Sequence, residues 1–197
     1  MEVDVAALDA GRAYRLLAGS VVPRPIAWVS TRSEDGVDNL APFSFFNVVS
    51  VSPPLVMFAP VDRGPDTLKD TAANVRDTEE FVVNVVTMDL AEAMNATSAT
   101  VPTDESEFDH AGVERAPASR VAPPRVAAAD VAFECRLHDF VDVGASSMVL
   151  GEVVHAHVAD DVATDGKVDV TKLDAVGRLS GNHYATTRDR FSMERPP

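Results

Sequence analysis

Residues 23–54 of the chain read PRPIAWVSTRSEDGVDNLAPFSFFNVVSVSPP, and the predicted fold rests mainly on this stretch. An apolar segment at 26–31 is followed by a polar turn at 33–38 with Asp35-Gly36 at its tip, which is typical of a β-hairpin. The segment after the turn mixes three phenylalanines with hydroxyl and amide side chains. A plain core strand would alternate more cleanly, and a plain loop would not carry these aromatics. The second strand of the hairpin is therefore expected to have a task besides packing.

The rest of the chain continues with extended segments in hairpin-like order. Residues 99–124 are rich in Pro, Asp and Ser and predict an irregular excursion. Full-length helices do not alternate with strands, which argues against a doubly wound parallel sheet. The sequence therefore predicts one mainly β domain over residues 1–197, an antiparallel barrel with short helical excursions. Further strands are expected at 48–51, 55–59, 80–86, 131–143 and 148–158, and short helices at 9–18, at 67–75 and from residue 87.

Composition and charge narrow the class of protein. The 197 residues are 46% hydrophobic and carry a formal net charge of −14. A protein this negative repels the phosphates of nucleic acids, which argues against nucleic-acid binding. No apolar run is long enough to cross a bilayer. A single cysteine, Cys135, and an acidic N-terminus without a basic signal-peptide region favour a cytoplasmic protein. Lysine occurs only at 69, 167 and 172, so the chain looks salt-adapted; an ordinary acidic protein is the alternative.

The common catalytic signatures are absent from the sequence. It has no Gly-x-Gly-x-x-Gly after a strand, no Gly-x-x-x-x-Gly-Lys, no His-Glu-x-x-His, no Cys-x-x-Cys and no Gly-x-Ser-x-Gly. His155 and His157 lie two apart on an expected strand and share a face, which suits a metal pair or a polar strand face. We expect no metal. Cys135 lies in an apolar strand and is expected to be buried rather than nucleophilic.

Four segments, taken in order, carry a resemblance to a known family. They are WVST…NLAPFSFFNVVSVSPP, RGPDTLKDTAANV, MVLGEVV and GRLSGNHY. Together they resemble the flavin reductase-like family, the flavoredoxin type of FMN-binding split β-barrel, and the resemblance covers residues 16–184. It implies a bound FMN, and a homodimer with the flavin at the interface, because two chains form the cleft in that family.

The resemblance places the flavin ring along the aromatic segment. An isoalloxazine ring is a flat apolar surface with a polar edge, which suits extended backbone, small residues and aromatic walls. Thr31, at the end of the preceding strand, is expected near the ribityl–phosphate side. Phe43 and Phe46 either line this site or belong to the core. The implied ring and ribityl contacts, made largely through the backbone, are Asn39, Ala41, Pro42, Ser44 and Phe45.

The phosphate of FMN is expected at Lys69-Asp70-Thr71, which matches the Lys-Asp-Thr of the family. A phosphate dianion needs cations and donors that converge on it. Lys69 would supply charge, Thr71 a hydroxyl and Arg63 a second cation, while Asp70 would orient its neighbours or cap a helix. The alternative for Lys69 is pairing with nearby acids. Arg24 is a further phosphate candidate, and its alternative is likewise an acidic partner.

The C-terminal segment and the activity complete the set of expectations. Tyr184, with Arg178 and Asn182, would close over the dimethylbenzene end of the ring or contact the partner subunit; ordinary strand packing is the alternative. The resemblance implies an oxidoreductase that moves electrons from NADH or NADPH through FMN to free flavin or another small-molecule or protein acceptor. No side chain is needed for covalent catalysis. The alternatives are an electron carrier without nicotinamide turnover and a related split barrel with another cofactor.

Overall fold

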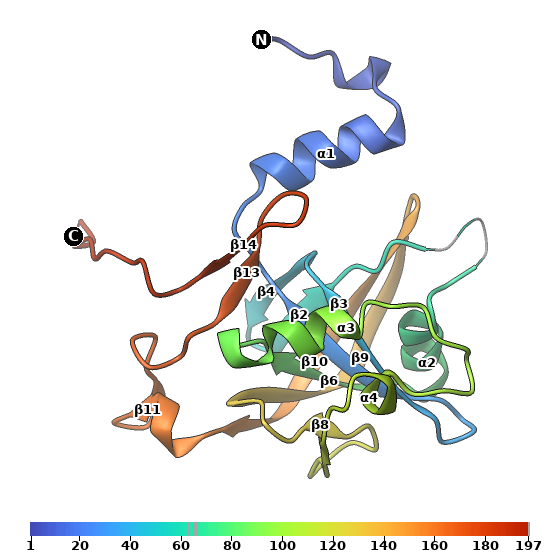
Figure 1. Ribbon diagram of the computed structural model, residues 1–197, viewed down its shortest axis with the longest axis vertical. Helices are drawn as coiled ribbons and strands as arrows, with labels where there is room; N and C mark the ends of the chain where they lie inside the picture. The colour runs from blue at the N-terminus through green and yellow to red at the C-terminus, as the bar shows by residue number, and fades with distance from the viewer. Residues whose placement is uncertain (63, 65–66, 197) are drawn as a thin grey trace.

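A computed structural model describes residues 1–62, 64 and 67–196, and its centre is a seven-stranded antiparallel sheet in the order β3-β2-β6-β9-β10-β5-β4 (Figure 1). The strands of this sheet are β2 (Ala27–Arg32), β3 (Asp38–Phe43), β4 (Phe46–Val51), β5 (Pro54–Phe58), β6 (Glu80–Val85), β9 (Val131–Val143) and β10 (Ser146–Val158). The helices are α1 (Ala10–Ser20), α2 (Asp70–Thr78), α3 (Ala91–Ala96) and α4 (Glu107–His110), with 3-10 turns at Val5–Ala7, Met88–Leu90 and Asp160–Val162.

Short strands form smaller sheets around the main one. β1 (Arg24–Pro25), β13 (Val176–Arg178) and β14 (Tyr184–Thr186) make a three-stranded sheet. Two further pairs are β7 (Arg115–Ala116) with β8 (Arg125–Val126) and β11 (Ala163–Thr164) with β12 (Lys167–Val168). The stretch at 99–124 is therefore not wholly irregular, because it contains α4 and β7.

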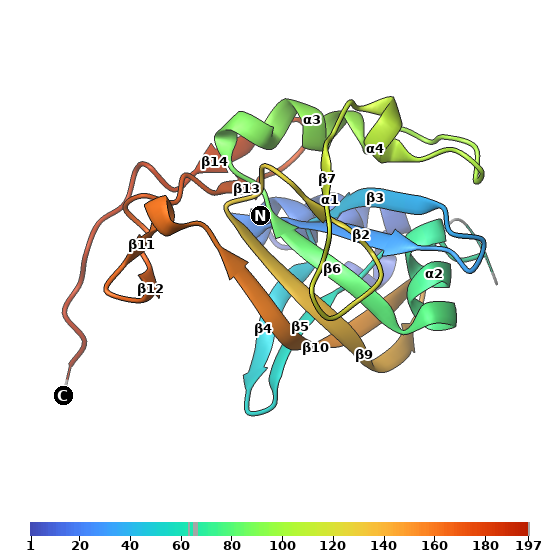
Figure 2. The same cartoon turned by 90° about the horizontal axis from the view of Figure 1, so that it is seen from below.

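The main sheet curls into a barrel because of where its two edges lie. β3 and β4 are at opposite ends of the strand order, yet only Ser44 and Phe45 separate them in the chain. Two residues cannot span a flat seven-stranded sheet, so the edges must come together. The amide of Ala59 donates to the carbonyl of Phe45 at this junction (2.8 Å). The expected mainly β split barrel is confirmed, and Figure 2 shows the β4–β5 hairpin extending from it.

The interior of the barrel is filled by one apolar cluster. Phe43, Phe58, Phe81 and Cys135 belong to it, and the ring centroids of Phe58 and Phe81 lie 5.3 Å apart. Phe43 is buried and Phe46 packs against the cluster, so both side chains contribute to the core. Cys135 is fully buried as expected, and burial raises the pKa of its thiol.

A second apolar cluster covers the outer face of β2 and β3. Trp28, Leu40, Met94 and Phe108 belong to it, and the indole Nε1 of Trp28 donates to Thr97 Oγ1 (2.8 Å). α3 and α4 lie over this face (Figure 2). β2 is thus covered on both sides, which explains why its burial is unbroken from Ala27 to Thr31 rather than alternating.

The start of one helix, α2, differs from the start that the sequence predicts. α1 begins after Asp9, whose carboxylate accepts from the Arg12 amide (2.8 Å), as the sequence predicts. α2 begins at Asp70 rather than at residue 67 and ends at Thr78, and its C-cap residue, Glu79, has a positive φ of 59°. Lys69 is therefore the N-cap of α2 rather than an interior residue. Among the described residues, no helix combines the length and apolar composition of a membrane span.

Candidate functional site

Two neighbouring cavities flank β3. The first, here the β3–α2 cavity, has a volume of about 200 Å³ and is lined from β3, α2 and the segment after α3. The second, the β13–β14 cavity, has a volume of about 630 Å³ and opens beneath α1. Pro42 and Ser98 line both, so the two cavities are contiguous along the end of β3.

The structure brings most of the predicted residues to these two cavities. The β3–α2 cavity is lined by Asn39, Ala41, Pro42, Lys69, Asp70 and Thr71. Pro42, Ser44 and Tyr184 line the β13–β14 cavity. Arg63 lies outside the described residues. The cofactor contacts of all these side chains stay predictions, but segments separated by up to about 140 positions in the chain do meet at one hollow surface.

A buried hydrogen-bond network centred on Asn39 forms the floor of the β3–α2 cavity. Asn39 Oδ1 accepts from Thr71 Oγ1 (2.7 Å) and from Thr31 Oγ1 (3.3 Å), and Asn74 Nδ2 donates to Thr31 (3.0 Å). Thr31, a buried member of the network, does not line the cavity itself. The network fixes the side chain of Asn39 and ties β2, β3 and α2 together.

Glu107 completes this network and was not predicted from the sequence. Asn39 Nδ2 donates to both of its carboxylate oxygens (2.9 Å each), and the Leu40 amide donates to Oε2 (3.0 Å). Burial raises the pKa of Glu107, the bonds from Leu40 and Asn39 oppose this, and the charge of Asp70 adds to it. Glu107 lies in the Pro-, Asp- and Ser-rich stretch, where no local pattern marks a buried acid.

Lys69 is exposed at the start of α2. Its Nζ lies 5.8 Å from the centroid of the Phe43 ring, and no described residue forms an ion pair with it. As the N-cap residue it offers no side-chain acceptor to the first turn of the helix. An anion at this place would meet both a cation and the amide groups of a helix N-terminus.

Arg24 is buried and engaged in structural hydrogen bonds. Its guanidinium donates to the carbonyls of Ala18 (2.5 Å), Val21 (2.8 Å) and Leu179 (3.0 Å), and Nε donates to Ser44 Oγ (3.3 Å). These contacts fasten the end of α1 to the β13–β14 hairpin and to the bend after β3. The phosphate contact considered for Arg24 stays a prediction, and no acidic partner is found among the described residues.

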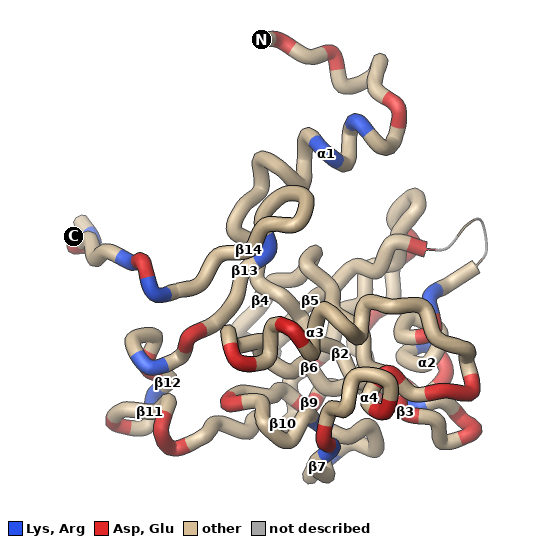
Figure 3. The backbone as a smooth tube through the Cα atoms, in the orientation of Figure 1, with Lys and Arg blue, Asp and Glu red and all other residues tan. Residues whose placement is uncertain are grey.

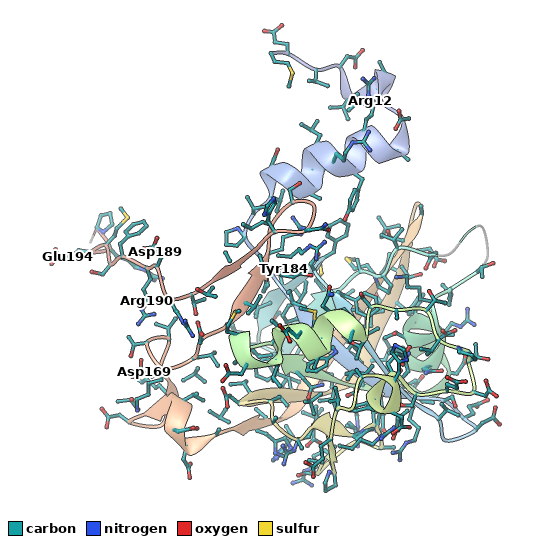
Figure 4. All side chains as sticks on the ribbon, viewed as in Figure 1. Arg12, Asp169, Tyr184, Asp189, Arg190 and Glu194 are labelled. Carbon is teal, nitrogen blue, oxygen red and sulfur yellow. The ribbon has the colours of Figure 1, made fainter. Side chains whose placement is uncertain are left out.

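Aromatic and cationic side chains form the wall of the β13–β14 cavity. The guanidinium carbon of Arg178 lies 4.5 Å from the centroid of the Tyr184 ring, and Arg178 donates to Tyr184 Oη. Figure 4 labels Tyr184, which lies beneath α1. Tyr14 of α1 also lines this cavity, and its ring centroid is 6.3 Å from that of Phe45. Phe45 itself is half-buried outside the cavity lining, with Arg24 stacked on it at 5.9 Å.

Comparisons with known proteins identify the family. The model of the flavin reductase like domain matches residues 18–172. Component B of nitrilotriacetate monooxygenase from Bacillus cereus is 32% identical, with a TM-score of 0.94 over 98% of each chain. The 2-nitrobenzoate 2-nitroreductase of Pseudomonas fluorescens is 34% identical, with a TM-score of 0.91 over 100% of this chain and 96% of that one.

Curated relatives extend this similarity over the full chain. An uncharacterized protein of Halalkalibacterium halodurans is 42% identical over 203 residues, covering 100% of this chain and 97% of the relative. A flavin reductase with a split barrel domain from Shewanella frigidimarina, 24% identical, has a TM-score of 0.83 over 100% of this chain and 98% of that one, which shows the shared fold. The chain therefore belongs to the flavin reductase-like family of split-barrel proteins.

Proposed function

We propose that this protein is an FMN-dependent oxidoreductase that passes electrons from NADH or NADPH to free flavin or to another acceptor. The observation that carries the proposal is that the two cavities adjoin at Pro42 and Ser98. One end offers a cation, polar groups and a helix N-terminus, and the other offers aromatic walls. That combination matches the phosphate tail and the flat ring of FMN, and the β13–β14 cavity, at about 630 Å³, has the volume of a small-molecule site.

The residues present fit the phosphate end of such a cofactor. Lys69 supplies positive charge without an ion-pair partner among the described residues, and α2 directs its N-terminal amides to the same place. The hydroxyl of Thr71 donates to Asn39, so it would serve a phosphate only by leaving that bond. The backbone amide of Thr71, in the first turn of α2, needs no such change.

Two acidic side chains, those of Glu107 and Asp70, also line the β3–α2 cavity. The carboxylate of Glu107 accepts hydrogen bonds from Asn39 and from the Leu40 amide, so its oxygens face the network. We propose that Glu107 positions Asn39 for the cofactor rather than touching phosphate. Asp70, in the first turn of α2, complements the helix dipole.

The ring end would use the free edge of β3. β3 is an edge strand, so one side of its backbone faces no neighbouring strand. On this side the Asp38 carbonyl accepts from Ser106 (2.5 Å) and the Leu40 amide donates to Glu107. We propose that the next positions, from Ala41 to Ser44, serve the polar edge of the ring in the same way. FMN, when bound, supplies the chemistry by accepting hydride from a reduced nicotinamide and passing electrons on.

We also propose a homodimer in which a second copy covers the open side of this site. α1 extends away from the barrel (Figure 1), and its apolar residues Tyr14 and Leu17 are 54% and 57% exposed. On β4, Val48 and Val51 are 60% and 88% exposed. Apolar residues this exposed on neighbouring elements are typical of an interface. Light scattering tests the proposal, and a monomeric mass with flavin still bound would contradict it.

We further propose a cytoplasmic, salt-adapted protein. Asp and Glu are spread along the chain while Lys and Arg are few (Figure 3), and the net charge is −14. Salt screens the repulsion among these acids, so the melting temperature should rise by roughly 4 °C or more from low salt to molar KCl. A melting temperature that does not rise between these conditions would contradict the adaptation.

Spectroscopy of the purified protein tests the proposed activity. The protein should carry a flavin absorption band, and anaerobic NADH or NADPH should bleach it without an added acceptor. A flavin band that neither nucleotide bleaches would indicate an electron carrier. Failure to bind FMN would contradict the proposal itself.

A further inference from the structure

Three metal-ligating side chains meet on the outer face of the barrel, away from both cavities of the proposed flavin site. They are Glu134 of β9 and His155 and His157 of β10. One ligand atom from each lies within 4.8 Å of the others. None of the three lines the β3–α2 or the β13–β14 cavity, so flavin binding gives them no task.

A strand irregularity brings the two histidines to this face. Val153 pairs with Cys135, and both pack into the barrel interior. Strict alternation would then direct His155 inward too. The register shifts between Val153 and His155, so that His155 lies opposite Glu134 on the outer face. Bulges of this kind often re-aim a side chain at a functional site.

The carboxylate of Glu134 is held as metal-binding carboxylates commonly are. It is fully buried and accepts from the amides of Ser119 (2.7 Å) and Arg120 (2.5 Å). The carboxylate is therefore an oriented ligand with backbone donors behind it.

The histidines lie on the solvent side of the carboxylate. The Nε2 atom of His157 is 2.5 Å from Glu134 Oε1, and the two imidazole centroids are 4.8 Å apart with the rings nearly perpendicular. The side chain of His157 is 24% exposed, which leaves an approach for an ion and a position for water. A tetrahedral ion needs ligand atoms about 3.4 Å apart. Side-chain rotations that move these atoms by about an ångström would bring the three ligand atoms to that spacing.

Contrary to the expectation of no metal from the sequence, we propose that Glu134, His155 and His157 bind one divalent transition-metal ion of the zinc class. Two imidazoles and one carboxylate are a recurrent donor set for such ions, with an open position for water. On binding, the ion would take the place of the direct contact between His157 Nε2 and Glu134 Oε1. The ion would also tie the end of β10 to the 119–120 segment through Glu134. A net charge of −14 favours the approach of a cation.

The competing account is a simple anchor, in which His157 and Glu134 hold the 119–120 segment and His155 has no role. Substitution of His155 separates the two accounts, since the His157–Glu134 contact remains in that variant. The matched control is His138→Ala, which removes an exposed histidine from β9. Untagged protein, as purified and then treated with chelator, would be titrated with Zn²⁺ by calorimetry, and melting would be followed with and without Zn²⁺.

The wild type and His138→Ala should bind one equivalent of Zn²⁺ and melt at a higher temperature with it. His155→Ala should bind at least tenfold more weakly, with its metal-free melting temperature unchanged, and His157→Ala should also lose affinity. The proposal is overturned if the wild type binds no stoichiometric Zn²⁺, or if His155→Ala binds it as tightly as His138→Ala. Neither result depends on the flavin, so failure here leaves the proposed reductase function intact.

Discussion

The two ends of the proposed flavin site differ in how firmly the barrel holds them. At the β3–α2 cavity, Asn39, Thr71 and Glu107 are buried, and Asn39 is hydrogen-bonded to both of the others across three elements. At the β13–β14 cavity, Tyr184 belongs to a three-residue strand and Tyr14 to a helix that extends from the barrel. One chain therefore builds the first end alone, whereas the second end is open to a partner or a substrate.

The largest expected effect comes from removing the acid that anchors the first end. Glu107→Ala leaves the buried Asn39 amide and the Leu40 amide without acceptors. We expect the free energy of unfolding in urea to fall by about 3 kcal/mol, because each buried unpaired donor costs about 1–3 kcal/mol. Glu105→Ala, two residues away and exposed, is the control and should change it by less than about 0.5 kcal/mol. Equal stabilities of the two variants would refute a structural role for the network.

Removing the cation at the first end should weaken cofactor binding without unfolding the protein. Lys69 is exposed, so Lys69→Ala should leave stability nearly unchanged. The affinity for FMN should fall roughly 10–100-fold, since a hydrogen bond to a charged group contributes about 1.5–3 kcal/mol. Fluorescence titration measures this, with the exposed Lys167→Ala as the matched control. If both lysine variants bind FMN alike, the phosphate lies elsewhere.

A substitution at the second end should have a smaller effect on FMN. Tyr184→Phe removes the hydroxyl that contacts Arg178 and Asn95 at a half-exposed position. We expect the FMN affinity to stay within about threefold and stability within about 0.5 kcal/mol, while the KM for the nicotinamide changes more. A loss of FMN affinity as large as that of Lys69→Ala would remove the distinction between the two ends.

The smallest effect is a pH dependence specific to the first end. The pKa of Glu107 is raised in the folded protein, so the folded state binds this proton more tightly than the unfolded chain does. Its contribution to stability therefore increases as the pH falls through the folded pKa and is lost as the pH rises through it. Relative to Glu107→Gln, the wild type should gain stability as the pH is lowered from 7 toward 4.5. A constant difference between the two urea curves across this range would contradict the assignment.

Much of the fold could be predicted because it follows from local patterns. The two long strands β9 and β10 and the cap of α1 at Asp9 follow from apolar runs, turn residues and capping chemistry. The curling of the sheet is not local. It results from β3 and β4 lying at opposite edges of the sheet while only two residues join them.

The candidate site could be predicted only in part, because some of its contacts join residues that are far apart in the chain. Motif residues such as Asn39 and Lys69 are recognisable in the sequence, and the structure brings them together. Glu107 is 68 positions from Asn39, so no sequence pattern links the two. The engagement of Arg24 by the carbonyls of Ala18, Val21 and Leu179 depends equally on tertiary packing.

A crystal structure of the protein grown with FMN would show where the cofactor binds. We expect the phosphate at Lys69 and the N-terminus of α2, with the ring extending past Pro42 toward the β13–β14 cavity. A phosphate bound at the β13–β14 end, or a flavin outside both cavities, would contradict this expectation.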